Sequence, residues 1–367
     1  MRSPHDIITA VSEVLEAFVS ECRKEILDDP IYAGAENPDV VATALIDHAA
    51  EALRGGKRLR ARFAFSGWRA VYSQEDHTGR VTTLGAALEV FQAAALVHDD
   101  IVDNSDTRRG RPAMHRAFES VHRAREWHGA SDSFGRSGAI LLGDLLLGWS
   151  DDLLERAISD ADAAAGVRAL YARMRRDVIL GQFLDIAEES AWPTIPDREH
   201  ATRALRIATL KSARYSVQQP LLLGAVLGGA RSDQIAALES FGHPLGIAFQ
   251  LRDDVLGVFG DESVTGKPSG DDLREGKRTL LIAYAREAMT ARDRAELDQR
   301  LGASDLTRDE IVALQQAIRD TGALDRVETL ITESASQADA AIDSADIDAE
   351  AATQLRDLTT AATRRSA

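Results

Sequence analysis

Residues 84–103 read LGAALEVFQAAALVHDDIVD, an apolar run that ends in three closely spaced aspartates. If this run is an α-helix, Asp99 and Asp103 are one turn apart on one face, and Asp100 lies beside them. Three carboxylates this close repel one another, and a hard cation would neutralise them. Mg²⁺ suits such a site because it takes one or two carboxylates together with substrate phosphate oxygens and water. The motif therefore indicates a Mg²⁺ site, although a solvated acidic helix end would give the same pattern.

A second acidic pair ends another apolar run later in the chain. Residues 244–254 read PLGIAFQLRDD, so Asp253 and Asp254 close a second helical pattern. Facing helices of a bundle often build metal sites between them. We therefore expect the two acidic pairs to face each other and to hold several Mg²⁺ ions around one diphosphate.

Basic residues accompany both acidic pairs, although the chain as a whole has a formal net charge of −16. Arginine offers a bidentate fork to phosphate oxygens and lysine a mobile point charge, so such a set suits a polyanionic substrate. Any one of these residues alone would be read as a surface charge. Adjacent glycines at positions 55 and 56 would let the backbone approach a phosphate closely. The basic set comprises Lys57, Arg58, Arg60, Arg108, Arg109, Lys211, Lys267, Lys277 and Arg278.

Helical spacing extends over nearly the whole chain, as at Leu141, Leu145, Trp149 and Leu153. No run of alternating β-branched and polar residues is present, so we predict an all-α fold with almost no strand. We expect residues 1–40 to form an N-terminal amphipathic helix and loop, and residues 41–367 to form a single all-α domain. Residues 332–352, rich in Ala, Asp and Ser, are predicted to form a surface helix. Gly and Pro clusters predict helix breaks at 29–37, 55–56, 73–78, 104–112, 129–138, 192–197, 228–233, 260–276 and 302–307.

Composition excludes several classes of protein. The excess of acidic residues argues against a nucleic-acid partner. Cys22 is the single cysteine, which rules out an intramolecular disulfide and a Cys-rich metal site and favours a cytoplasmic setting. The longest apolar stretches are too short for a bilayer span or are interrupted by Glu89, so no stable membrane anchor is expected.

The motifs together resemble those of the trans-isoprenyl diphosphate synthases of the polyprenyl synthetase family, and most of all a geranylgeranyl diphosphate synthase. The resemblance implies an all-α, single-domain bundle around a deep central cavity, working as a homodimer. It further implies a Mg²⁺-dependent enzyme that joins isopentenyl diphosphate to an allylic prenyl diphosphate. The matching segments are GGKRLR (55–60), LVHDDIVDNSDTRRGRPAMH (96–115), ILLGDLLL (140–147), GQFLDI (181–186), LKSA (210–213), FQLRDDVLGVFGD (249–261), TGKP (265–268) and EGKRT (275–279).

The resemblance also implies a role for each matched residue. Mg²⁺ on the allylic diphosphate would be bound by Asp99, Asp100, Asp103, Asp253 and Asp254. The same diphosphate would be contacted by Arg108, Lys211, Lys267 and Lys277. Isopentenyl diphosphate would be bound by Gly56, Lys57, Arg60, Gln92 and Arg109. Ser212 and Gln250 would stabilise a carbocation, and Gln182 with Asp185 would line the allylic site.

The sequence departs from the family pattern at three of these places. Gly257 stands where many members carry a third aspartate of the second motif, and Asp261 is a possible substitute for it. Ser212 replaces the commoner threonine and keeps the hydroxyl group. Gln92 replaces the histidine of many relatives. Only the glycine puts a function in doubt, namely metal affinity at the second motif.

The residues before Asp99 bear on product length. In the family, the residues four and five before the first aspartate line the top of the pocket for the growing chain, and here they are Ala95 and Ala94. These small side chains would leave the pocket open, with Phe91 as a floor about one helical turn of ~5.4 Å deeper. That arrangement favours a C20 product, geranylgeranyl diphosphate. Alternatively, both alanines merely pack against a neighbouring helix and other residues form the floor.

Three alternative functions remain at this point. The same reaction could give farnesyl diphosphate or a longer polyprenyl diphosphate. A class I terpene cyclase also ionises an allylic diphosphate with DDxxD and Mg²⁺, but it needs no second diphosphate site such as GGKRLR. A catalytically silent subunit that binds prenyl diphosphates is supported only by Gly257.

Overall fold

The computed structural model describes residues 4–32, 40–72, 78–261, 269–303, 305–343 and 345–363. The chain forms two compact units. The first comprises residues 1–65 and 74–164, and the second residues 66–73 and 165–367. The described residues are mostly helical, and their only strands are the two-residue strands β1 and β2. The predicted all-α fold is therefore confirmed. One predicted site residue, Lys267, lies outside the described residues.

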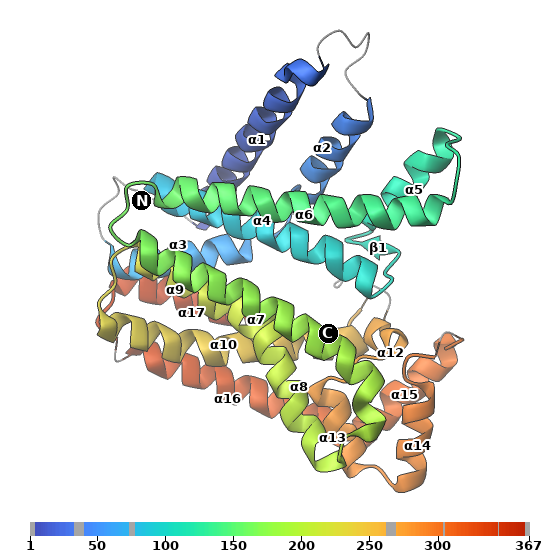
Figure 1. Ribbon diagram of the computed structural model, residues 1–367. Helices are drawn as coiled ribbons and strands as arrows, with labels where there is room; N and C mark the ends of the chain where they lie inside the picture. Colours follow the sequence, from blue (N-terminus) through green and yellow to red (C-terminus); the bar gives the residue numbers. More distant parts are fainter. Residues whose placement is uncertain are drawn as a thin grey trace. The chain divides into compact units, whose positions relative to one another are not determined.

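The first unit is built around α4 (Thr78–Val102) and α6 (Ser131–Ile158), which run side by side (Figure 1). The apolar side chains of α4 that are completely buried include those of Leu84, Ala86, Ala87, Leu88 and Val90. Its small alanines allow α6 to approach, and the buried Ser150 hydroxyl of α6 donates a hydrogen bond of 2.6 Å to the Ala87 carbonyl. The remaining elements of this unit are α1 (Pro4–Asp28), η1 (Pro30–Tyr32), α2 (Val40–Ala52), the start of α3 (Leu59–Val71), β1 (Thr107–Arg108), β2 (Arg111–Pro112) and α5 (Met114–Ala124).

Among the described residues, α4 is the one helix long and apolar enough to cross a membrane. However, 72% of its apolar window is buried inside the protein. A core helix of a water-soluble protein passes the same test of length and composition, so α4 gives only weak evidence for a membrane span.

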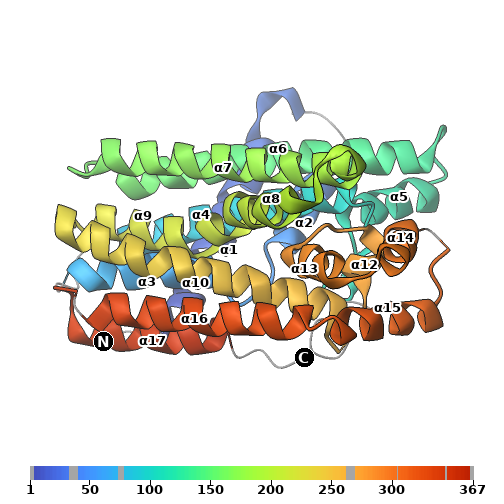
Figure 2. The same ribbon diagram turned by 90° about the horizontal axis from the view of Figure 1, so that it is seen from below.

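The second unit is built around α10 (Ser232–Phe259), which packs along α16 (Ala323–Asp343) and also contacts α17 (Ala349–Thr363) (Figure 2). Its core side is apolar and buried, as at Leu245, Leu251 and Val258. The other elements of this unit are α7 (Ala164–Ala191), η2 (Trp192–Thr194), η3 (Asp197–Glu199), α8 (His200–Ala208), η4 (Thr209–Gln218), α9 (Gln219–Leu227), α12 (Asp271–Glu275), α13 (Leu280–Ala288), α14 (Ala291–Arg300) and α15 (Arg308–Asp320).

Two local predictions are wrong. The break expected at 129–138 ends at residue 130, and Gly135 lies inside α6. A side chain at position 135 would overlap the His115 carbonyl of α5. This glycine therefore serves close helix packing. The single surface helix expected over 332–352 is two helices, since α16 ends at Asp343 and α17 begins at Ala349. Ala338 of α16 is fully buried.

Candidate active site

The acidic end of α4 is held by an arginine of the hairpin that follows it. The Arg108 Nε atom donates to Asp100 Oδ1 at 2.8 Å, and its Nη2 atom donates to Asp99 Oδ2 at 3.2 Å. Asp100 is buried, whereas Asp99 and Asp103 are half-buried. The Asp103 amide donates to the Asp99 carbonyl at 2.8 Å, so a helical turn links these two aspartates as the sequence predicted. These hydrogen bonds hold the Arg108 guanidinium next to the carboxylates of Asp99 and Asp100.

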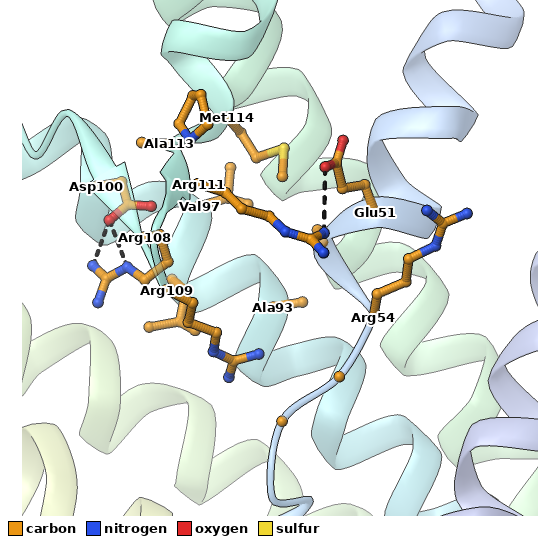
Figure 3. Close-up of a pocket in the computed structure, with 15 residues that line it drawn as sticks. Glu51, Arg54, Ala93, Val97, Asp100, Arg108, Arg109, Arg111, Ala113 and Met114 are labelled. Carbon is orange, nitrogen blue, oxygen red and sulfur yellow. Dashed lines mark hydrogen bonds and ion pairs between the residues drawn. The ribbon is translucent and has the colours of Figure 1, made fainter. Parts of the chain in front are cut away.

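A very tight hairpin presents Arg108, Arg109 and Arg111. Its strands β1 and β2 pair Thr107 with Pro112 and Arg108 with Arg111. Arg109 and Gly110 between them have φ values of 53° and 72°, and two positive φ angles are typical of a type I′ turn. Positive φ costs energy in a residue with a side chain, and such strain clusters at functional sites. In Figure 3, Arg108 points to Asp100 and Arg111 to Glu51.

The GGKRLR segment approaches this hairpin through its glycines. Gly55 and Gly56 have φ values of 70° and 88°, and a Cβ atom on Gly56 would lie 3.1 Å from the Arg109 guanidinium. Arg58 has a different role from the other basic residues of this segment. It is buried, donates to the Leu53 carbonyl at 2.6 Å and lies 3.8 Å from the Glu89 carboxylate of α4. Arg58 therefore anchors the segment to α4.

The first unit contains an open pocket of about 260 Å³ between these elements (Figure 3). Of the predicted site residues, it brings together Gly56, Asp100, Arg108 and Arg109. The sequence analysis missed Glu51, Arg54 and Arg111, which also line it. Arg111 lies in the same TRRGRP segment as Arg109, so a hairpin read from that segment could have indicated it. The other predicted ligands of isopentenyl diphosphate do not line this pocket: Lys57 is exposed, and Arg60 and Gln92 are half-buried.

The electrostatics of the first unit favour an anion. Partial desolvation lowers the pKa of Arg109, and the negative charge of Glu89 opposes this shift. The positive charges of Arg58, Arg108 and Arg60 lower the pKa further. A phosphate that binds between neighbouring cations reduces the repulsion between their positive charges.

The residues predicted to control product length lie in the middle of α4. Phe91 and Ala94 are buried, and Ala95 is half-buried. On the helix, Ala95 shares a face with Asp99, one turn later, and with Phe91, one turn earlier. Ala94 is rotated by about 100° from Ala95.

In the second unit, Lys211 and Ser212 lie on the π-helical segment η4. Such segments are rare and are frequent at functional sites. Glycines on both neighbouring helices allow this wide segment to pack closely. A Cβ atom on Gly181 of α7 would lie 2.7 Å from the Lys211 Cα atom, and one on Gly246 of α10 would lie 3.0 Å from the Ala213 Cα atom. No motif in the sequence had indicated the π-helix.

Lys211 reaches the predicted allylic site on α7, where its Nζ atom donates to Asp185 Oδ2 at 2.6 Å. Gln182, one turn before Asp185, is half-buried, as is Ser212. The structure thus brings these four predicted residues to neighbouring parts of α7 and η4.

In the second acidic motif, near the end of α10, Asp254 is buried and Asp253 is half-buried. The Gln250 amide donates to Asp254 Oδ1 at 2.6 Å. Burial, together with the negative charges of Asp272, Asp253 and Asp185, raises the pKa of Asp254 to about 8, although the Gln250 hydrogen bond opposes this shift. Carboxylates from α7 (Asp185), α10 (Asp253) and α12 (Asp272) therefore repel the ionised form of Asp254. Lys277 is close to the same group, pairing with Glu275 and lying 3.9 Å from Asp272.

The donor groups of both motifs fit Mg²⁺. In the described part of the chain, no three His, Cys, Asp or Glu side chains already converge on a metal position. Mg²⁺ needs only one or two protein carboxylates, because phosphate oxygens and waters complete its octahedron. A cation would also relieve the repulsion that raises the pKa of Asp254.

Comparison with known proteins agrees with this geometry. Residues 42–319 match the family model described as polyprenyl synthetase. The chain belongs to the polyprenyl synthetase family. It is therefore a trans-prenyltransferase, and the family implies prenyl diphosphate substrates.

Individual relatives cover most of the chain. A short chain isoprenyl diphosphate synthase of Methanothermobacter thermautotrophicus is 30% identical over 83% of this chain and 82% of its own length. A geranylgeranyl diphosphate synthase of Sulfolobus acidocaldarius is 27% identical over 86% and 83%. The crystal structure of a Corynebacterium glutamicum geranylgeranyl pyrophosphate synthase with isoprenyl diphosphate and magnesium is 37% identical, covers 100% of both chains and has a TM-score of 0.90. Geranylfarnesyl and farnesyl diphosphate synthases also match, so these likenesses leave the product length of this prenyltransferase unresolved.

The raised pKa of Asp254 predicts how stability depends on pH in chelator-treated enzyme. A carboxyl group whose pKa rises on folding stabilises the fold below its unfolded value of 3.8, and this contribution is lost as the pH rises to about 8. We expect the free energy of unfolding to fall across this window, by at most about 1.4 kcal/mol per pH unit for this one group. Urea unfolding at several pH values measures it. Asp254→Asn should flatten the profile, and identical profiles of the two proteins would contradict the prediction.

Proposed function

We propose that this prenyltransferase condenses isopentenyl diphosphate with an allylic diphosphate in a Mg²⁺-dependent reaction and releases geranylgeranyl diphosphate. The observation that carries the proposal is the pairing of carboxylates with fixed cations, at the first acidic motif and on α7. Arg108 contacts Asp99 and Asp100, and Lys211 contacts Asp185. Each of these two contacts thus holds a carboxylate that could bind metal next to a cation that could bind phosphate. The magnesium in the similar Corynebacterium glutamicum structure supports the same assignment.

The allylic diphosphate must leave as an anion, and the chain supplies cations to receive it. The bond between the allylic C1 carbon and the diphosphate oxygen breaks, and both of its electrons stay with the oxygen. Arg108, Lys211 and Lys277 would stabilise the negative charge that develops there, together with Lys267 outside the described residues. Mg²⁺ bound by the aspartates of both motifs would act as a Lewis acid on the same phosphate oxygens.

The second substrate needs its own anion site. Gly56, Lys57, Arg60, Gln92 and Arg109 would hold the diphosphate of isopentenyl diphosphate. The closeness of Gly56 to the Arg109 guanidinium supports this arrangement. Positioning the double bond beside the allylic carbon converts a bimolecular step into an effectively unimolecular one.

The carbocation requires oxygen atoms without nucleophilic reactivity. The Ser212 hydroxyl and the Gln250 amide oxygen would stabilise it, since the amide nitrogen of Gln250 is engaged by Asp254. Gln182 and Asp185 would line the same substrate. The isopentenyl double bond forms the new carbon–carbon bond, and the proton then lost passes to the departed diphosphate. No protein nucleophile or general base is needed, and apolar helix faces would exclude water.

Substitution of the first acidic motif tests this mechanism. Asp99→Asn and Asp103→Asn should each lower kcat at least about 100-fold, because the charge on the leaving diphosphate is no longer compensated. Turnover of isopentenyl diphosphate measures this loss, and circular dichroism checks that helical content is unchanged. Asp162→Asn, at an exposed position, is the matched control. Near-wild-type turnover in either motif variant would contradict the metal assignment.

We propose that the small side chain of Ala95 leaves room for a C20 product. Ala95→Phe should shorten the product from C20, because the larger side chain narrows the pocket that we propose above Phe91. Mass spectrometry of products from a C5 starter measures this. Ala340→Phe, at an exposed position of α16, should leave the product unchanged. An unchanged C20 product from an active Ala95→Phe enzyme would place the pocket floor elsewhere.

Exposed apolar residues support a homodimer. On α7, Ile179 and Phe183 are 65% and 66% exposed, and Leu180 and Ile186 extend the same apolar strip. On α6, Leu141 is 62% exposed. Contiguous exposed apolar surface usually marks a protein interface. In a two-fold dimer each strip would pack against the same strip of a second copy.

Light scattering after gel filtration tests the dimer. Phe183→Asp should convert the wild-type dimer to a monomer, because it places a charge in the apolar contact. Val312→Asp, at a 57% exposed position of α15, should remain dimeric. A monomeric wild-type enzyme would contradict the proposal.

We also propose that the enzyme works in the cytoplasm. Cys22 is buried, and burial raises the pKa of its thiol to about 11. The thiol is thus protonated and unreactive at neutral pH, which fits a structural cysteine in a reducing compartment.

A further inference from the structure

The second acidic motif contains a glycine where a third carboxylate is expected, and another part of the chain fills that space. Gly257 follows Asp254 by nearly one helical turn on α10. A Cβ atom on Gly257 would overlap the carboxylate of Asp272, lying 2.7 Å from its Oδ1 atom. Asp272 therefore occupies the position from which a side chain at residue 257 would extend. Asp261, the substitute considered from the sequence, is exposed beyond the end of α10.

Asp272 is held there by the short helix α12. The helix is bounded by two glycines in the left-handed conformation, Gly270 at φ 76° and Gly276 at φ 80°. The Asp272 carbonyl accepts hydrogen bonds of 3.1 Å from the amides of Gly276 and Lys277. The next residue, Leu273, is completely buried. The backbone that carries Asp272 is thus fixed on both sides.

The position of Asp272 places it next to the second motif. Gly257, whose Cβ position the Asp272 carboxylate occupies, follows Asp253 by about one helical turn and shares a face of α10 with it. The Lys277 Nζ atom lies 3.9 Å from the Asp272 carboxylate. Asp272 therefore stands among the proposed metal and diphosphate ligands of the second unit.

We infer that Asp272 supplies a carboxylate to the second Mg²⁺ site, from the space that Gly257 leaves open. This inference rests on the proposed binding of Mg²⁺ by Asp253 and Asp254. In this account Gly257 is required because any side chain there displaces Asp272. The acidic group that the linear motif lacks is provided by a residue on a different helix.

Calorimetric titration of the full-length enzyme with MgCl₂, in saturating inorganic diphosphate, tests the inference. Asp272→Asn should weaken Mg²⁺ binding about 10-fold. Gly257→Ala removes no carboxylate, yet it should weaken binding to a similar extent. The double variant should be no weaker than either single one, because both changes remove one interaction. Asp261→Asn should bind like wild type.

A transposed carboxylate provides the decisive control. Gly257→Asp combined with Asp272→Ala restores an acid at position 257 and frees the space that it needs. We expect this variant to recover binding that Asp272→Ala alone has lost. Wild-type binding in both Asp272→Asn and Gly257→Ala would overturn the inference, and so would a loss confined to Asp261→Asn. Absence of Mg²⁺ binding in the wild type would instead contradict the proposed function on which the inference rests.

Discussion

Burial of carboxylates at the ends of two core helices is the constraint on which the site depends. Burying an unpaired charge costs much free energy, so the negative charge of each motif must be neutralised. On α4, the buried Asp100 receives the Arg108 guanidinium. On α10, the buried Asp254 receives only an amide hydrogen bond from Gln250, and its pKa rises to about 8. The negative charge of the first motif is neutralised by the guanidinium of Arg108. The second motif has no such partner at Asp254, so a bound metal cation would neutralise its charge.

Close backbone packing places the other functional groups. Glycines on α7 and α10 admit the π-helical segment η4, which carries Lys211 and Ser212. Glycine at position 56 admits the Arg109 guanidinium, and glycine at position 257 admits the Asp272 carboxylate. In each case the absence of a side chain lets a charged or polar group come close to a helix or loop. These glycines therefore contribute to the site indirectly, by leaving space for Lys211, Arg109 and Asp272.

The sequence alone was sufficient for the all-α fold and for the family. Both depend on local spacing, such as the apolar run before Asp99 and the repeat of an acidic pair at Asp253. It could not show contacts between residues far apart in the chain. Arg58 was grouped with the phosphate-binding cations, but it is buried against Glu89. Arg111 and Asp272 were missed because a hairpin turn and a separate short helix bring them to the site.

The most direct test of the central claim is the chain length of the product that the wild-type enzyme forms. Isopentenyl diphosphate would be supplied with C5, C10 or C15 allylic diphosphates, in Mg²⁺ and in excess chelator, and the products identified by mass spectrometry. The account predicts a C20 diphosphate from every starter in Mg²⁺ and no condensation in chelator. A product of another length, condensation that persists without divalent metal, or no condensation with any starter would contradict it.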